Sequence, residues 1–264
     1  MTLFQSILLG VLQGTAEFLP VSSSGHLALL KSIMRLSDVP ILFDILLHIS
    51  TLCVVVIVFR VRVAGLLTAC FRFMAGKTRT EDSENLKLVP VIIVATLCTA
   101  VIGYGISKLE LEQYPKVVSA LLIVTGVILL LTIRTSGNKD YSKTGLREGI
   151  LTGIAQGIGV FPGISRSGIT ISAALFSGMA REKAGEFSFL ISIPAILGAF
   201  LLKLKDAGRL LTMVNPGVLA AGIIAAFIIG LISLILLMRI IRSGKLFFFS
   251  MYLIPIGIAG VIFL

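Results

Sequence analysis

The sequence predicts an all-α polytopic membrane protein with an inverted-topology repeat, in which each half is a re-entrant helical hairpin plus three transmembrane helices. Three observations predict this fold class. First, 56% of the 264 residues are hydrophobic and only 14% are charged, with a mean hydropathy of +1.06, outside the usual range of a soluble globular domain. Second, six apolar stretches have the length of a membrane span. Third, one short motif occurs twice.

The apolar stretches are of two kinds. Six of them are each near the ~20 residues that a helix needs to cross the hydrocarbon. Two others, 2–36 and 148–180, are interrupted by Pro, Gly and Ser, so each half is too short to cross and a hairpin that enters and leaves on one face is expected. The N-terminal stretch does not fit a secretory signal, because no Lys or Arg precedes Lys31. The six predicted spans are 41–59, 88–107, 117–133, 184–202, 217–238 and 246–264.

Loop cations predict the orientation of the spans. Segment 60–87 is rich in Lys and Arg and is expected to be a cytoplasmic loop, whereas 108–116 has balanced charges and is expected outside. Continuing this alternation requires 148–180 to enter from the cytoplasm and 1–36 to enter from outside. One segment does not conform, because Lys203, Lys205 and Arg209 fall on the external side with only Asp206 to offset them.

The repeated motif defines the two halves. Residues 10–25, GVLQGTAEFLPVSSSG, align without gaps with residues 153–168, GIAQGIGVFPGISRSG, and seven of the sixteen positions are identical. Each copy precedes three predicted spans, and an odd number of spans inverts the second half. We therefore expect a single membrane domain over 1–264, with internal repeats of about 1–133 and 145–264, whose two hairpin tips meet near the midplane.

Each predicted tip resembles an anion-binding site. The first half-helix ends near Pro20 or Pro162, and the second begins at a serine-rich turn. Serine is a good N-cap, and a helix start offers unpaired N–H groups and partial positive charge. Two such starts that converge at one place favour an anion, most obviously a phosphate.

Charged residues at the tips extend this prediction. The planar guanidinium of Arg166 suits bidentate contact with phosphate, but an arginine at this depth needs a partner. In the alternative, structural reading, Arg166 forms only an ion pair with Glu17, and Glu17 only locks the helices together. Gln13 and Glu17 share a helix face. Glu17 could activate a serine, orient His26 or hold a divalent cation.

The nucleophile is expected among three serines. Ser22, Ser23 and Ser24 are all plausible caps or phosphate contacts, and Ser23 is the preferred nucleophile because it aligns with Arg166 in the repeat. A serine nucleophile needs a base within hydrogen-bond reach, and His26 or Glu17 could serve. For Asp44 and His48, four residues apart, an interfacial pair is favoured over a proton relay.

Two features exclude other classes of site. Cys53, Cys70 and Cys98 are isolated from one another and predict packing rather than a metal site or disulfide. The net charge of +10 is explained by cytoplasmic loops, so nucleic acid is not an expected partner.

At these motifs the sequence closely resembles the undecaprenyl pyrophosphate phosphatase family of bacterial inner membranes, often called the bacitracin-resistance proteins. Its signatures are an E/Q-x-x-x-E helix running into a P-V-S-S-S/T-G-H loop, and a P-G-x-S-R-S-G-x-T loop. Here they stand as Gln13 to Glu17 with PVSSSGH, and as PGISRSGIT from Pro162 to Thr170. Length and span pattern agree over essentially the whole chain.

The resemblance implies a polyprenyl-diphosphate phosphatase, a phosphoric anhydride hydrolase. Its substrate would be a C55 polyprenyl (undecaprenyl) diphosphate, and its product the monophosphate lipid carrier that is recycled in cell-wall peptidoglycan synthesis. It also implies bacitracin resistance and a multi-pass protein of the inner (plasma) membrane, with the active site open to the external, periplasmic side. Membrane lipids would surround the protein, and the sequence leaves open whether it is a homodimer.

The resemblance also implies roles for individual residues. Glu17, Ser23 and His26 would be catalytic, and Arg166 would bind phosphate with Ser165, Ser167 and Thr170 nearby. The family is associated with divalent cations, Mg²⁺ or Ca²⁺, for which Glu17 is the candidate ligand. Gln13 falls within the family pattern but weakens a model in which two carboxylates grip the metal. Ser22, Ser24 and Gln13 complete the expected substrate-binding set.

Two other classes of function remain open from the sequence. A transporter or lipid flippase is the runner-up, because inverted repeats with broken helices are a common transporter design. A purely structural scaffold leaves the buried Glu, Arg and His without a reason. A nucleophile beside a histidine and opposite an arginine favours the enzyme.

Overall fold

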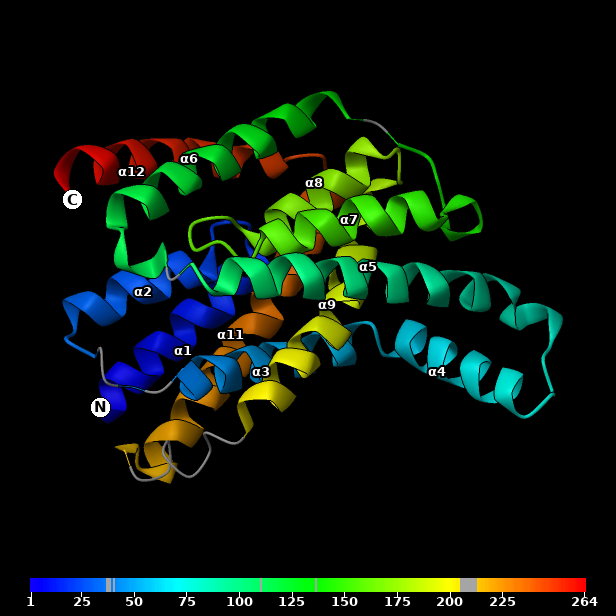
Figure 1. Cartoon of the computed structure of the whole chain (residues 1–264), viewed down its shortest axis with the longest axis horizontal. Helices are drawn as coiled ribbons and strands as arrows, with labels where there is room; N and C mark the ends of the chain where they lie inside the picture. The colour runs from blue at the N-terminus through cyan, green and yellow to red at the C-terminus, as the bar shows by residue number, and fades with distance from the viewer. Residues whose placement is uncertain (37–38, 40, 110, 136, 205–212) are drawn as a thin grey trace.

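The computed structural model describes residues 1–36, 39, 41–109, 111–135, 137–204 and 213–264. Over these residues the chain is all-α, and its single β-type pairing is an isolated bridge between Lys139 and Met179. Most helices lie roughly along one direction, and α1 and α2 meet α7 and α8 in the middle of the bundle (Figure 1). The predicted all-α class is therefore confirmed.

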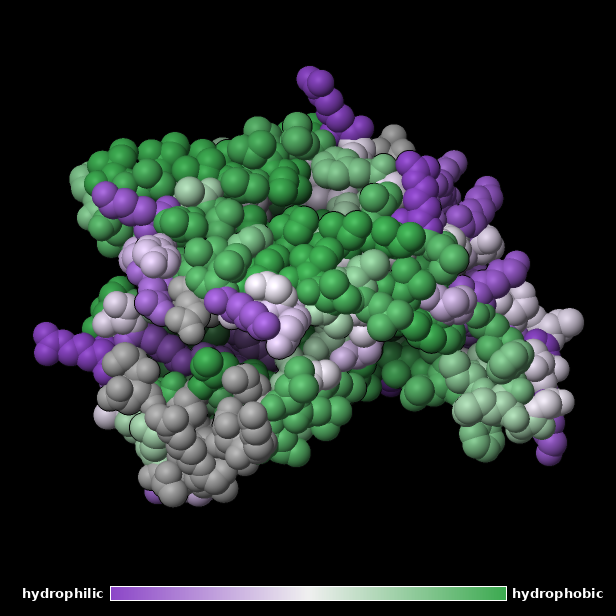
Figure 2. All heavy atoms as spheres, in the orientation of Figure 1, coloured by the Kyte–Doolittle hydropathy of each residue, from purple (hydrophilic) through white to green (hydrophobic). Residues whose placement is uncertain are grey.

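Six helices are long and apolar enough to span a membrane, which confirms the six predicted spans. Prolines at the first turn mark the starts of α6 and α11, where the missing N–H is not needed. Figure 2 shows hydrophobic side chains covering the face over α5, α6 and α12, with hydrophilic side chains toward the ends of the molecule. The protein is thus a multi-pass membrane protein. The spans contain α3 (Ile41–Val58), α5 (Ser83–Ser107), α6 (Pro115–Leu131), α9 (Arg181–Lys203), α11 (Pro216–Arg242) and α12 (Ser250–Phe263). Adjoining 3₁₀ turns extend three of them, to Thr80–Ser107, Pro115–Arg134 and Leu246–Phe263.

The two interrupted regions form pairs of short helices. The first pair is α1 (Leu3–Phe18) and α2 (Ser23–Ile33), and the second is α7 (Leu146–Ile158) and α8 (Arg166–Phe176). Both second helices begin at a serine N-cap, as the sequence predicts, because the serine oxygen accepts a backbone N–H of the first turn. Ser22 accepts from Gly25 at 3.4 Å, and Ser165 accepts from Gly168 at 3.1 Å.

Each pair packs its first helix against a long helix from the other half of the chain. Helix α1 packs against α11, and α7 packs against α5. Glycines allow this approach: a Cβ at Gly10 would lie 2.2 Å from the carbonyl oxygen of Gly222, and one at Gly153 would lie 2.5 Å from that of Ala95. Small residues drive such close backbone packing in membranes, where the lipid offers no hydrophobic force between helices.

Residues 60–87 are largely helical, which corrects the expectation of a loop, while their cytoplasmic location stays a prediction. Residues Arg60–Met74 form α4, a 3₁₀ turn follows at Thr80–Asp82, and α5 begins at Ser83. Arginine is a good helix former, so the cations that make the segment too polar for a span do not prevent a helix. Helix α4 leaves the main bundle alongside the start of α5 (Figure 1). Glu110, Lys205, Asp206 and Arg209 of the predicted external segments lie outside the described residues.

We predict that Gly10→Ala destabilises the fold. An alanine within a helix is normally about 1 kcal/mol more stable than glycine, but here the added methyl would overlap the backbone of α11 and force the helices apart. A loss of about 1–3 kcal/mol is expected for such overpacking, and thermal unfolding in detergent measures it. The matched control is Gly105→Ala on α5, where a Cβ meets nothing within 4 Å. If both variants shift the unfolding temperature equally, close packing is not the reason for Gly10.

Candidate active site

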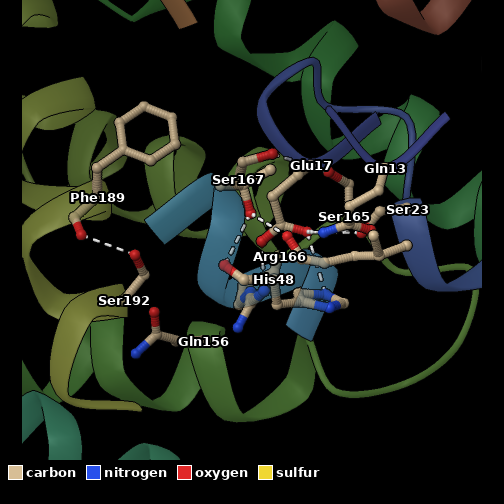
Figure 3. A network of polar contacts seen from close by, with 12 residues as sticks. Gln13, Glu17, Ser23, His48, Gln156, Ser165, Arg166, Ser167, Phe189 and Ser192 are labelled. Atoms are coloured by element: carbon tan, nitrogen blue, oxygen red, sulfur yellow. Dashed lines mark hydrogen bonds and ion pairs between the residues drawn. The ribbon is translucent and has the colours of Figure 1, made fainter. Parts of the chain in front are cut away.

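The tips of the two helix pairs are joined by an ion pair between Glu17 and Arg166. Glu17 lies in the last turn of α1, and Arg166 is the first residue of α8. The Arg166 guanidinium contacts Glu17 Oε1. The second carboxylate oxygen accepts the Ser23 hydroxyl at 2.7 Å and the Gln13 side-chain amide at 3.1 Å. Figure 3 shows these side chains gathered around the Glu17 carboxylate.

His48 of α3 is a further partner of Glu17, and sequence reasoning did not place it there. Its Nε2 lies 3.2 Å from Glu17 Oε2, and its Nδ1 lies 2.8 Å from the backbone carbonyl of Asp44. Both nitrogens face acceptors, so the doubly protonated imidazolium satisfies both. The sequence signal for this role was a histidine within a predicted span. Ionisable residues inside a membrane cost free energy and are usually functional.

The expected pairing of Asp44 with His48 is wrong at the level of side chains. The Asp44 carboxylate binds the Lys31 ammonium at 2.6 Å, and only its backbone carbonyl meets His48. The reason is the helix itself, because the carbonyl at position i faces residue i+4. This contact turns the imidazole so that Nε2 points at Glu17.

His26 is engaged away from this cluster. Its Nδ1 lies 2.9 Å from the Ser22 carbonyl, its Nε2 lies 2.7 Å from the Tyr252 hydroxyl of α12, and the two rings stack. The structure therefore does not bring either ring nitrogen of His26 to Ser23. The acceptor of the Ser23 hydroxyl is Glu17. A catalytic role for His26 stays a prediction.

Ser22 links the two tips through a hydrogen bond. Its backbone has a φ of +71°, in a region that few non-glycine residues adopt, and its hydroxyl also accepts the backbone N–H of Gly163 at 3.1 Å. On the second tip, Thr125 of α6 donates to the Gly163 carbonyl and accepts the Ser165 N–H, at 3.2 and 3.1 Å. The turns are thus fixed by buried hydroxyls.

The remaining predicted residues lie on α8 or beside it. The Ser165 and Ser167 hydroxyls are 3.2 Å apart. Thr170 donates to the Arg166 carbonyl at 2.8 Å and contacts the hydroxyl of Ser188 on α9. Ser24 lines the same cavity as Ser23. All the predicted residues except His26 therefore lie at the meeting point of the tips.

A cavity of about 170 Å³ opens between the tips, and we call it the head-group cavity. The N–H groups of Ser23 and Ser24 on one tip, and of Arg166 and Ser167 on the other, have no acceptor among the described residues. Such helix starts favour anions. The positive charge of Arg166 also favours an anion, and a doubly protonated His48 would add a second positive charge. The lining of the head-group cavity includes Glu17, Ser23, Ser24, His48, Ser165 and Arg166.

A divalent cation fits this site only if the substrate supplies ligands. Among the described residues no cluster of three or more His, Cys, Asp or Glu side chains could hold a metal. However, Gln13 Oε1 is buried without a hydrogen-bond partner, on the same amide whose nitrogen donates to Glu17 Oε2. Mg²⁺ commonly binds through one or two protein oxygens together with substrate phosphates. The donor set fits a cation shared with phosphate, and does not fit a cation held by protein alone.

Comparisons with known proteins agree along nearly the whole chain. A family model described as "Bacitracin resistance protein BacA" matches residues 6–259. An undecaprenyl-diphosphatase of Treponema denticola is 49% identical over 98% of this chain and 96% of its own. An undecaprenyl-diphosphatase of Borrelia recurrentis is 42% identical over 95% and 94%, and one of Desulforapulum autotrophicum is 36% identical over 99% and 98%.

We predict that Ser22→Ala destabilises the protein by about 1–3 kcal/mol, because two buried backbone N–H groups, at Gly25 and Gly163, lose their acceptor. Thermal unfolding in detergent measures the change. Ser243→Ala is the control, since its hydroxyl only donates to the exposed Ile240 carbonyl. An unchanged unfolding temperature for Ser22→Ala would show that the tips are held together without this hydroxyl.

Proposed function

The chain belongs to the bacitracin resistance protein BacA family, and from this premise we propose that it is a membrane phosphatase. The substrate is a polyprenyl diphosphate of the undecaprenyl (C55) class, and the products are the monophosphate lipid carrier and inorganic phosphate. The observation that carries this proposal is the Ser23 hydroxyl, bonded to Glu17 in a cavity that also holds Arg166 and two helix starts. The product would return to cell-wall synthesis.

The geometry supports Ser23 as nucleophile and Glu17 as its base. The Ser23 Oγ–H points at Glu17 Oε2 over 2.7 Å, within the range required of a general base. In the first step Ser23 Oγ attacks the terminal phosphorus, its proton passes to Glu17, and the P–O bond to the leaving polyprenyl phosphate breaks. In the second step water attacks the phosphoserine, a proton returns to Ser23 Oγ, and phosphate leaves. Direct attack by water is the alternative.

Arg166, His48 and the helix starts supply the charge that phosphoryl transfer needs. Catalysis of this reaction is mostly positioning and electrostatic stabilisation of the phosphoryl oxygens. Arg166 can offer bidentate contact to these oxygens, and His48 keeps Glu17 oriented between the nucleophile and the arginine. A bound Mg²⁺ or Ca²⁺, held by Glu17, Gln13 Oε1 and substrate oxygens, would neutralise phosphate charge.

We infer that the two helix pairs are re-entrant hairpins of an inverted repeat. The reciprocal packing supports this, because α1 contacts the second long helix after α8, and α7 contacts the second long helix after α2. The cation distribution supports entry from opposite faces. In this arrangement the head-group cavity faces the periplasmic side of the inner membrane. Greater bacitracin tolerance on overexpression would support a role in resistance.

The test of the proposed function is inorganic phosphate release from undecaprenyl diphosphate by purified protein in detergent, with and without added Mg²⁺ or Ca²⁺. Wild type should release phosphate, and Ser23→Ala and Arg166→Ala should each lose about 10²-fold or more, as expected for groups that act in the transition state. Circular dichroism and unfolding temperature show whether the variants are folded. No release by folded wild type under any condition would overturn the proposal and favour a transporter.

A second prediction separates the two histidines. His48→Gln should lower phosphate release about 10²-fold, because Glu17 loses a charged partner, whereas His26→Gln should have less effect because its ring contacts Tyr252 rather than Ser23. Tyr252→Phe is the matched control for His26, since it removes the same hydrogen bond from the other side. A large loss in His26→Gln with activity retained in His48→Gln would assign the catalytic role to His26.

A further inference from the structure

A cavity of about 830 Å³ lies between α4, α9 and α11, and we call it the arginine cleft. Helix α4 packs against the start of α5 and hardly touches α9 or α11, so the space between them stays open. The arginine cleft shares no lining residue with the head-group cavity, and the two are therefore separate sites. Its lining includes Val61, Arg62, Glu182, Glu186, Arg239 and Arg242.

At the inner end of the arginine cleft the charges balance. The Arg62 guanidinium binds Glu84 and Glu186, each at 2.9 Å, and lies over the ring of Tyr141. Lys183 Nζ also contacts Glu186, at 3.4 Å. Two cations thus meet two carboxylates. This network holds α4 to α5 and α9, and it leaves no net charge for a ligand.

At the rim of the arginine cleft positive charge is in excess. Arg239 and Arg242 lie three residues apart in the last turns of α11, so they share a face. Arg242 binds Glu182 at 2.7 Å, but both side chains are more than half exposed, and such a surface pair contributes little stability. The Arg239 guanidinium has no hydrogen bond or ion pair with any residue that the structure describes. Two arginines therefore face one carboxylate, which favours an added anion.

Apolar side chains line the wall next to these arginines. Ile235, Met238, Arg239 and Arg242 follow the spacing i, i+3, i+4 and i+7 and all line the cleft, so one face of α11 changes from apolar to basic toward the end of the helix. Ile235 is exposed, as is Val61 on α4. The loop cations assign this end of α11 to the cytoplasmic side. An apolar face that ends in arginines matches a lipid with an anionic head group.

We propose that the arginine cleft binds an anionic phospholipid of the cytoplasmic leaflet, with its phosphate between Arg239 and Arg242 and its acyl chains against Val61 and Ile235. An arginine suits bidentate contact with phosphate, and basic pockets between membrane helices on the cytoplasmic side recognise anionic head groups. The cavity volume lies within the usual range of ligand sites. A bound lipid fills the space between α4 and α11, and it therefore stabilises the folded protein.

The first experiment compares two lipids and two variants. Binding of phosphatidylglycerol and of zwitterionic phosphatidylcholine to delipidated protein in detergent is measured by native mass spectrometry and by the rise in Tm. Wild type should bind phosphatidylglycerol more tightly and gain Tm from it. Arg239→Gln should weaken this binding about tenfold, because a charge-assisted contact is lost. Lys245→Gln is the matched control, since it removes a charge just beyond α11 but does not line the cleft, and it should keep the wild-type affinity.

Three results would overturn the proposal. Equal affinity of wild type for the two lipids would show that the cleft holds unselective bulk lipid. An equal loss of affinity in both variants would trace the effect to the net charge of this end of the protein. Displacement of phosphatidylglycerol by inorganic phosphate at equal concentration would assign the rim to free anions. Tm values without lipid establish that both variants are folded, and Arg239→Gln breaks no contact among the described residues.

The second experiment places the lipid within the protein. Phosphatidylglycerol with a photoreactive group near the start of an acyl chain is cross-linked to wild-type protein, and the labelled peptides are mapped. Labels within 58–65 and 235–242 are expected, and Arg239→Gln should reduce them. Labels within 159–166 instead would place the lipid in the head-group cavity and overturn the proposal.

Discussion

The ion pair between Glu17 and Arg166 is the interaction on which the rest of the site depends. The two residues are 149 positions apart, and an unpaired charge at this depth costs about 2.5–3.5 kcal/mol on insertion scales. Pairing lets both tips stay within the bundle. The same carboxylate then contacts Ser23, Gln13 and His48, so one charged group holds a hydroxyl, an amide, an imidazole and the Arg166 guanidinium in place.

Close helix packing explains why the two tips can meet. Gly10 and Gly153 occupy equivalent positions in the repeat, and each allows its short helix to touch the backbone of a long helix from the other half. Helices α1 and α7 are thereby held by α11 and α5. Ser22 and Thr125 then fix the turns through buried hydrogen bonds. These buried hydrogen bonds hold the backbone of the tips in position, which limits reorganisation during phosphoryl transfer.

The repeat has diverged in chemistry while keeping its geometry. Gln13 and Gln156 are equivalent and both are buried, and each keeps one side-chain oxygen without a partner. Gln13 donates to Glu17, whereas Gln156 donates to Thr99 and the Ile191 carbonyl. One tip thus carries the acid and the serine, and the other carries the arginine.

The sequence by itself determined the six spans, the broken helices and the serine caps, because hydropathy, proline and N-cap chemistry are local properties. It also indicated Glu17, Ser23 and Arg166, since the repeat placed them at equivalent tips. Only the tertiary structure decided that His48 rather than His26 contacts Glu17 and that Asp44 binds Lys31. The helical structure of Arg60–Met74 was also decided there. Such contacts depend on how helices distant in sequence rotate and separate against one another, and spacing along the chain does not encode that.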